Sequence, residues 1–164
     1  STRGWTREDL AQFLSTGLSP QGVMTFRMFP VLSHSTKYLP DRDIEAVVSY
    51  LAEEMPEPAS PPSDPAAIEA HSEGHRLYMG LCAGCHGGDG QGQPFGSVPM
   101  VGNTTLMLDN PLNLHRVIRE GIPARSLSGH LRMQEMPAFE ATLEDSELEA
   151  LTEYLRDRWG VGAM

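Results

Sequence analysis

The chain has 164 residues and a formal charge of −10, with 22 acidic side chains against 12 basic ones. This acidity argues against a nucleic-acid partner. It suits a protein partner with a basic or mixed docking surface, or it serves only to keep the chain soluble. No run of 18 or more apolar residues occurs, so the sequence predicts no transmembrane helix.

Residues 1–55 form the first predicted unit, and a proline-rich stretch separates it from the rest of the chain. Five prolines fall within the eleven residues 55–65. Such a composition predicts an extended, semi-rigid linker with little to bury. We therefore expect a linker at 56–68 and a second unit at 69–164.

The second unit contains the motif Cys82-Ala-Gly-Cys85-His86, which holds both cysteines of the chain. Two thiols at this spacing followed by histidine are the attachment signature of c-type haem. The thiols bond to the two vinyl groups of the porphyrin, and the histidine becomes the proximal iron ligand. A zinc site would need a second pair of ligands, a thioredoxin-like pair would follow a strand, and a plain disulfide would not explain His86. We therefore expect one covalent haem c per chain.

The predicted elements of this unit are helical. A helix runs from about Ile68 or Ser72 into the motif, a second covers about 111–120 and ends at Gly121, and a third covers 143–158. We expect Gly74 to let the first and third helices approach closely, so that Tyr78 packs against Tyr154. No segment alternates convincingly as a strand, so the predicted fold class is all-α.

A repeat relates the two units. Residues 39–51 resemble residues 143–155 at a constant offset of 104 positions, and the same offset relates four positions near residue 10 to positions near 114. Projected back, the haem motif would fall before Ser1. We therefore interpret residues 1–55 as a partial cytochrome c-like unit without its own attachment motif, through either a cut or a natural loss. Met28 stands where a ligand of that absent haem could lie, although a core methionine or a pure docking module are the alternatives.

The sixth iron ligand of the second unit must come from elsewhere, and Met136 is the main candidate. It lies 50 residues beyond His86, and Pro137 after it disfavours helix. Met133 is the alternative, while Met100 and Met107 lie nearer the motif. A His/Met pair raises the haem potential relative to two histidines.

Further candidates concern the surroundings of the haem. The carbonyl of Pro99 could accept a hydrogen bond from the second ring nitrogen of His86. Arg119, Arg125 and Arg132 are candidate partners of the haem propionates by charge. The five other histidines have no metal-ligand spacing, and we interpret them as surface or packing residues.

With these residues in view, the chain resembles a class I cytochrome c. The resemblance rests on Gly74-x-x-x-Tyr78, the haem motif, Pro99, Met136-Pro-Ala-Phe139 and the Tyr154-Leu155 helix. More narrowly, the chain is similar to the C-terminal part of multihaem cytochrome c subunits of bacterial membrane-associated alcohol and gluconate-type dehydrogenases. Those share the Cys-Ala-x-Cys-His-Gly-x-Asp-Gly-x-Gly pattern seen at 82–92, and Met28 precedes a His-Ser-Thr-x-Tyr-Leu stretch as in their preceding domain.

The resemblance implies an electron carrier, not a catalytic subunit. Electrons would pass from a dehydrogenase partner toward a quinone or a terminal oxidase. The alternative is a haem enzyme or a sensor of gas or peroxide with an open distal site. Because haem c is attached outside the cytoplasm, we expect a periplasmic protein whose leader is absent from this chain. The partial first unit also suggests a domain-swapped or complex-bound oligomer.

Overall fold

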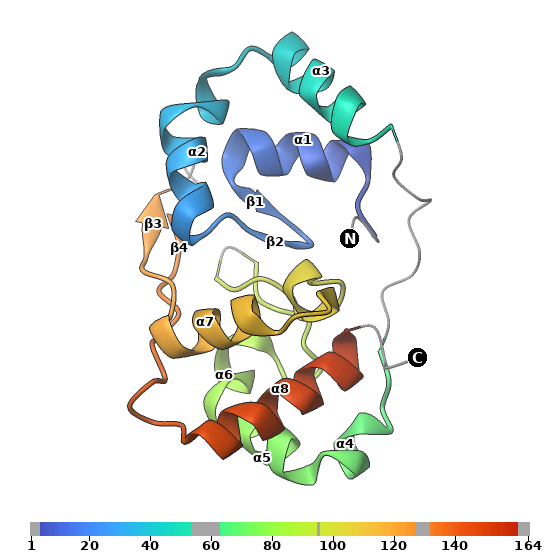
Figure 1. Ribbon diagram of the computed structural model, residues 1–164, viewed down its shortest axis with the longest axis vertical. Helices are drawn as coiled ribbons and strands as arrows, with labels where there is room; N and C mark the ends of the chain where they lie inside the picture. The colour runs from blue at the N-terminus through green and yellow to red at the C-terminus, as the bar shows by residue number, and fades with distance from the viewer. Residues whose placement is uncertain (1–3, 54–62, 95, 127–131, 161–164) are drawn as a thin grey trace.

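The computed structural model describes residues 4–53, 63–94, 96–126 and 132–160, without the side chain of Arg132. Figure 1 shows the helices of the first unit above those of the second. The first unit consists of α1 (Arg7–Thr16), β1 (Leu18–Ser19), β2 (Gly22–Val23), η1 (Phe26–Met28), α2 (Phe29–His34), η2 (Thr36–Tyr38) and α3 (Asp41–Leu51).

The second unit is likewise mostly helical. It consists of α4 (Ala67–Ala70), α5 (Ser72–Leu81), α6 (Ala83–His86), η3 (Thr104–Met107), α7 (Leu112–Glu120), β3 (Arg125–Ser126), β4 (Arg132–Met133) and α8 (Asp145–Trp159). The fold is helical as predicted, but the described part also contains two antiparallel ribbons, β1–β2 and β3–β4. Sequence alternation could not reveal them, because each strand is only two residues long.

The core of the second unit forms where α5 crosses α8. A Cβ on Gly74 would lie 2.2 Å from the carbonyl oxygen of Ala150, so only glycine allows this approach. Tyr78 and Tyr154 pack with ring centroids 5.7 Å apart, and both contact Trp159. All three aromatic side chains are essentially fully buried, and burial of each contributes on the order of 2 kcal/mol. The predicted helix pair is therefore confirmed.

The repeat-related helices α3 and α8 differ in burial. Leu151, Tyr154 and Leu155 of α8 are 0%, 1% and 2% exposed. The residues 104 positions earlier in α3 are Val47, Tyr50 and Leu51, and they are 38%, 79% and 48% exposed. Helix α1 packs against α3 and Ile44 and Val48 are buried, but no described helix covers the three exposed residues as α5 covers their counterparts in α8.

The two units contact each other directly. The indole Nε1–H of Trp5 donates to Oγ1 of Thr104 at 2.7 Å, and the backbone N–H of Thr104 donates to the carbonyl of Gln21 at 2.9 Å. Most of the predicted linker lies outside the described residues. The C-terminal end of the linker is bound to the second unit, because the backbone N–H of Asp64 donates to the carbonyl of Arg158 and α4 packs on α8.

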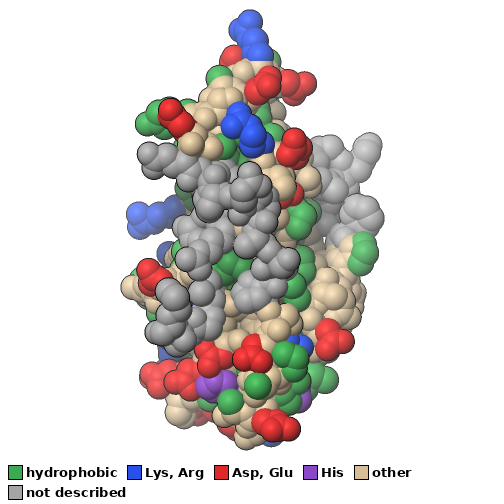
Figure 2. Space-filling view, turned by 90° about the vertical axis from the view of Figure 1, so that its right-hand side faces the viewer, with side chains coloured by type: hydrophobic (Ala, Val, Ile, Leu, Met, Phe, Trp, Pro, Cys, Tyr) green, Lys and Arg blue, Asp and Glu red, His purple; other side chains and the backbone are tan. Residues whose placement is uncertain are grey.

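Acidic side chains outnumber basic ones in both units. The second unit, residues 69–164, has 13 acidic and 7 basic side chains. Figure 2 shows Asp and Glu side chains gathered around a histidine at its lower end. Among the described residues, no helix combines the length and apolar character needed to cross a bilayer.

Candidate haem site

One helical turn presents the three residues of the motif to the same cavity. Cys82 ends α5 and precedes α6, and its carbonyl accepts from the backbone N–H of Cys85 at 3.1 Å and of His86 at 2.9 Å. Both thiols are free. Together with the imidazole of His86 they line one pocket. Within the described part of the chain, no group of three or more His, Cys, Asp or Glu could form an alternative metal site.

The ring of His86 is held in one orientation. Its Nδ1 lies 2.9 Å from the carbonyl oxygen of Val98. Because a carbonyl only accepts hydrogen bonds, Nδ1 carries the proton and Nε2 keeps its lone pair. Burial lowers the pKa of His86, while the bond to Val98 opposes that shift. The buried imidazole is therefore neutral and suited to bind iron through Nε2.

The predicted role of the Pro99 carbonyl is wrong. That carbonyl accepts from Nδ2 of Asn103 at 3.3 Å, and Val98 occupies the place facing His86. Successive carbonyls of extended backbone point in opposite directions, so only one of two neighbours can face the ring. A shift of one residue in the loop decides which one it is, and the sequence does not reveal that register.

Burial also affects the first thiol. Burial is the main cause that raises the pKa of Cys82 to about 11, and the nearby Cys85 adds a smaller contribution in the same direction. The Cys82 thiol is therefore protonated at neutral pH and lies in apolar surroundings. A thioether bond to a haem vinyl group would replace this titratable group by an apolar one that suits its site.

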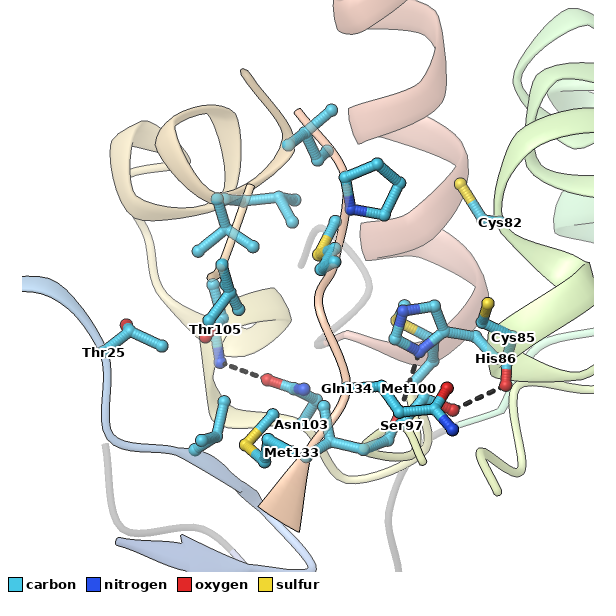
Figure 3. Close-up of a pocket in the computed structure, with 18 of the residues that line it drawn as sticks. Thr25, Cys82, Cys85, His86, Ser97, Met100, Asn103, Thr105, Met133 and Gln134 are labelled. Carbon is cyan, nitrogen blue, oxygen red and sulfur yellow. Dashed lines mark hydrogen bonds between the residues drawn. The ribbon is translucent and has the colours of Figure 1, made fainter. Parts of the chain in front are cut away.

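The pocket has the size and lining for a large apolar ligand. It encloses about 1120 Å³ of empty space, part of it open to solvent. Apolar side chains from α5, η3, α7 and α8 form much of its wall, and they include Leu81, Leu106, Leu114, Val117, Ile118 and Leu155. Figure 3 shows Cys82, Cys85 and His86 on one side of the cavity and Met133 and Thr25 on the far side. Two thiols, a neutral imidazole and this apolar wall fit a covalently attached porphyrin.

Three methionines line the pocket, and their surroundings distinguish them. Met100 follows Val98 by two residues and belongs to the loop beneath His86. Met133 packs against Met24 and Leu32 in the core of the first unit. Met136 packs against the core of the second unit. Met107 is buried in η3 and does not line the pocket.

The backbone of Met136 is firmly placed. Met136 and Ile122 exchange two backbone hydrogen bonds of 2.9 Å. A Cβ on the neighbouring Gly121 would lie 2.4 Å from the carbonyl oxygen of Met136, so glycine is required at the end of α7. This close packing fixes the segment that presents Met136 to the cavity.

The arginines predicted to bind propionates are engaged elsewhere. Arg119 pairs with Asp145 on the surface, and the guanidinium of Arg125 lies over the ring of Phe29, 3.8 Å from its centroid. Neither lines the pocket, so the structure does not support that role for them. The side chain of Arg132 lies outside the described residues. The sequence shows that an arginine is charged, but it does not show which group will lie next to that charge in the folded protein.

Several residues that line the pocket were not predicted from the sequence. They are Ser97, Asn103, Thr105 and Gln134, together with Val23 and Thr25 from the first unit. Ser97 Oγ donates to the carbonyl of Cys85 at 2.5 Å and thereby ties the loop to the motif. No motif signals these positions, because they reach the pocket only through tertiary packing.

Met28 of the first unit does not belong to a core. Its side chain is 51% exposed, so the alternative of a core methionine is wrong. Among the histidines, Nε2 of His71 lies 2.7 Å from Asp157, and the ring of His75 contacts that of Tyr154 in a tilted arrangement. Those two are packing residues as expected, and His130 lies outside the described residues.

Comparison with known proteins agrees with the site. Residues 69–155 match the family described as cytochrome c oxidase, cbb3-type, subunit III. A nicotinate dehydrogenase subunit of Pseudomonas putida is 36% identical over 97% of this chain and 14% of that protein. The fructose dehydrogenase cytochrome subunit of Gluconobacter japonicus is 32% identical over 95% of this chain and 37% of that protein. The gluconate 2-dehydrogenase cytochrome c subunit of Pantoea cypripedii is 26% identical over 97% of this chain and 38% of that protein.

The chain thus spans well under half the length of these relatives. Two of them are named as cytochrome subunits, in agreement with the predicted electron carrier. The matched residues contain the haem motif, which confirms haem c as the cofactor. Because the match covers more than half of the chain, this protein belongs to the cytochrome c family described as cytochrome c oxidase, cbb3-type, subunit III.

Proposed function

We propose that this chain transfers single electrons within a dehydrogenase complex, from the dehydrogenase toward a quinone or a terminal oxidase. One observation carries the proposal: two thiols and a neutral, oriented imidazole line one apolar pocket that Met136 also lines. When bound, haem supplies reversible one-electron chemistry between Fe(III) and Fe(II). Relatives named as cytochrome subunits of dehydrogenases support the choice of partner.

The residues of the chain have separate tasks in this proposal. Cys82 and Cys85 anchor the macrocycle, and His86 is the proximal ligand whose orientation Val98 fixes. Met136, which lines the same pocket, would supply the second protein ligand to the haem through its sulfur. The apolar wall excludes water and raises the potential, as does methionine in place of a second histidine. With both axial positions filled, no site remains for a substrate.

The distal ligand is tested by substitution in the holoprotein. We expect the wild type to show the weak far-red absorption band of a methionine–iron bond in the ferric state. Met136→Ala should abolish that band and allow rapid binding of carbon monoxide in the ferrous state. Met100→Leu and Met133→Leu are matched controls that line the same pocket and should keep the band. A wild type without the band that binds carbon monoxide would favour the open-site alternative.

We also propose that residues 1–55 are a partial cytochrome c-like unit. Three exposed apolar residues of α3 correspond to the three residues of α8 that α5 covers, which supports a missing helix equivalent to α5. Another part of a longer polypeptide or a second, domain-swapped chain would supply that helix. Met28, half exposed, would ligate the haem that such a helix carries.

The number of haems per chain tests whether residues 1–55 lack a haem attachment site of their own. Intact mass spectrometry with a haem stain on residues 1–164 should find one haem per chain, attached at Cys82 and Cys85. Two haems would contradict the repeat-based interpretation. Size-exclusion chromatography with light scattering should detect a dimer if a second chain covers α3.

We further propose that the protein is periplasmic, because haem c is attached outside the cytoplasm.

A further inference from the structure

The first unit contributes directly to the haem pocket of the second. Val23 at the end of β2 and Thr25 just after it line the same cavity as Cys82, Cys85 and His86. Figure 3 shows Thr25 across the cavity from the motif. The wall element η3 is also bound to the first unit, because Thr104 is hydrogen-bonded both to Trp5 and to Gln21. The haem site is therefore built from both units.

A further set of contacts between the units involves the segment that leads to Met136. This segment leaves α7 at Gly121, passes through β3 and β4, and returns to pair with Ile122 at Met136. The first unit holds both strands. Arg125 of β3 lies over the ring of Phe29 in α2, and Met133 of β4 packs against Met24 and Leu32.

The guanidinium of Arg125 has few contacts other than the ring of Phe29. The Nε of Arg125 is buried without a hydrogen-bond partner among the described residues, so the aromatic ring is the main contact seen for this guanidinium. A cation over a ring is more strongly attracted when water is excluded. Phe29 also packs on the Met24 and Leu32 cluster that receives Met133. One side chain of the first unit therefore supports both strands of the segment.

We propose that the first unit holds the Met136 segment against the haem pocket, and that Phe29 is a positioning residue for this axial ligand. The inference rests on the proposed function, since it takes Met136 as the distal ligand. Loss of the Phe29 contact loosens β3 and β4, and the motion reaches Met136 three residues beyond Met133. The Met136 sulfur would then hold the haem less firmly, and water would enter the pocket more easily.

The test uses the holoprotein of residues 1–164 with carbon monoxide as the probe. This ligand is neutral, so its binding reports the open axial position and not a change of charge. In Phe29→Ala we expect carbon monoxide binding to become about tenfold faster, which corresponds to about 1.4 kcal/mol. The far-red band should weaken and the midpoint potential should fall. Val31→Ala, a truncation in the same helix at a residue that is 38% exposed, should match the wild type.

A double-mutant cycle separates positioning from general destabilisation. Arg125→Ala should reproduce the effect of Phe29→Ala, and the double variant should show little more than either, because one contact is lost in all three. Arg125→Lys should restore most of the wild-type behaviour. Arg42→Ala removes a remote, exposed charge and controls for charge alone. Phe29→Leu keeps the apolar volume and replaces Phe29→Ala if the latter does not fold.

The outcomes are distinct from those of the proposed function. A wild type without a far-red band refutes Met136 ligation itself. A wild type with the band, whose Phe29 and Arg125 variants bind carbon monoxide at the wild-type rate, overturns the positioning role only. Fully additive effects of the two substitutions would also overturn it.

Discussion

Helices α3 and α8 carry similar amphipathic sequences at equivalent places in the repeat, yet they differ in how much of their apolar surface is buried. Ile44 and Val48 of α3 are buried, but Val47, Tyr50 and Leu51 are exposed where the matching residues of α8 are buried. Tyr154 is 1% exposed and Tyr50 is 79% exposed. The difference arises from the neighbouring helices: α5 lies across α8, whereas α1 packs against α3 but leaves Val47, Tyr50 and Leu51 exposed, and no other described helix covers them. The apolar face thus marks a place where a partner helix belongs, whether or not one is present. The following predictions test this comparison.

The largest effect is expected from removing the haem anchor. Cys82→Ala combined with Cys85→Ala should leave the second unit largely unfolded, because its apolar pocket would no longer hold the macrocycle covalently. A domain has only about 5–15 kcal/mol of stability to lose. Far-ultraviolet circular dichroism and a haem stain measure the outcome. A native-like spectrum without haem would contradict the prediction.

The equivalent tyrosines should differ greatly in their contribution to stability. Tyr154→Ala removes a buried ring that contacts Tyr78 and Trp159, and it should lower the free energy of unfolding by about 3–5 kcal/mol. Tyr50→Ala at the matching position of α3 should change it by no more than about 0.5 kcal/mol. Thermal and denaturant unfolding measure both. Equal effects would mean that α3 is covered in solution.

The helix crossing can be tested at a single methyl group. Gly74→Ala places a Cβ 2.2 Å from backbone, so it should cost about 1–3 kcal/mol. Gly80 lies in the same helix, and a Cβ there meets nothing within 4 Å. Gly80→Ala should therefore stabilise the protein by up to about 1 kcal/mol through helix propensity. The two substitutions should therefore change the free energy of unfolding in opposite directions. Denaturant unfolding measures both changes and separates the effect of the close helix crossing from that of helix propensity.

The smallest predicted difference concerns how the two helices begin. Glu144 and Glu147 form a capping box at the start of α8, where the Glu144 N–H donates to Glu147 at 3.0 Å. The equivalent N-cap of α3 is Pro40, which has no N–H to donate. Glu147→Ala should cost about 1 kcal/mol, and Asp43→Ala only a few tenths. Similar costs in thermal unfolding would show that the box contributes little.

Local and strongly constrained features were predictable from the sequence. The haem motif lies within one turn, so its spacing alone places Cys82, Cys85 and His86 together. The approach of α5 to α8 was likewise visible, because Gly74 and Tyr78 lie one turn apart on a helix whose partner has a matching apolar face. Features that depend on loop register were not. Val98 instead of Pro99 faces His86, and Arg125 meets Phe29.

The sequence by itself therefore determined the cofactor, its attachment and the helical pair that supports it, because those depend on residue chemistry and on short helical spacing. Only the tertiary structure decided that Val23 and Thr25 of the first unit line the haem pocket and that Phe29 supports the Met136 segment. It also decided that Tyr154 of α8 is buried while Tyr50 at the matching position of α3 is exposed. The physical reason is that burial and contact are properties of pairs of surfaces, and one sequence segment shows only its own side of each pair.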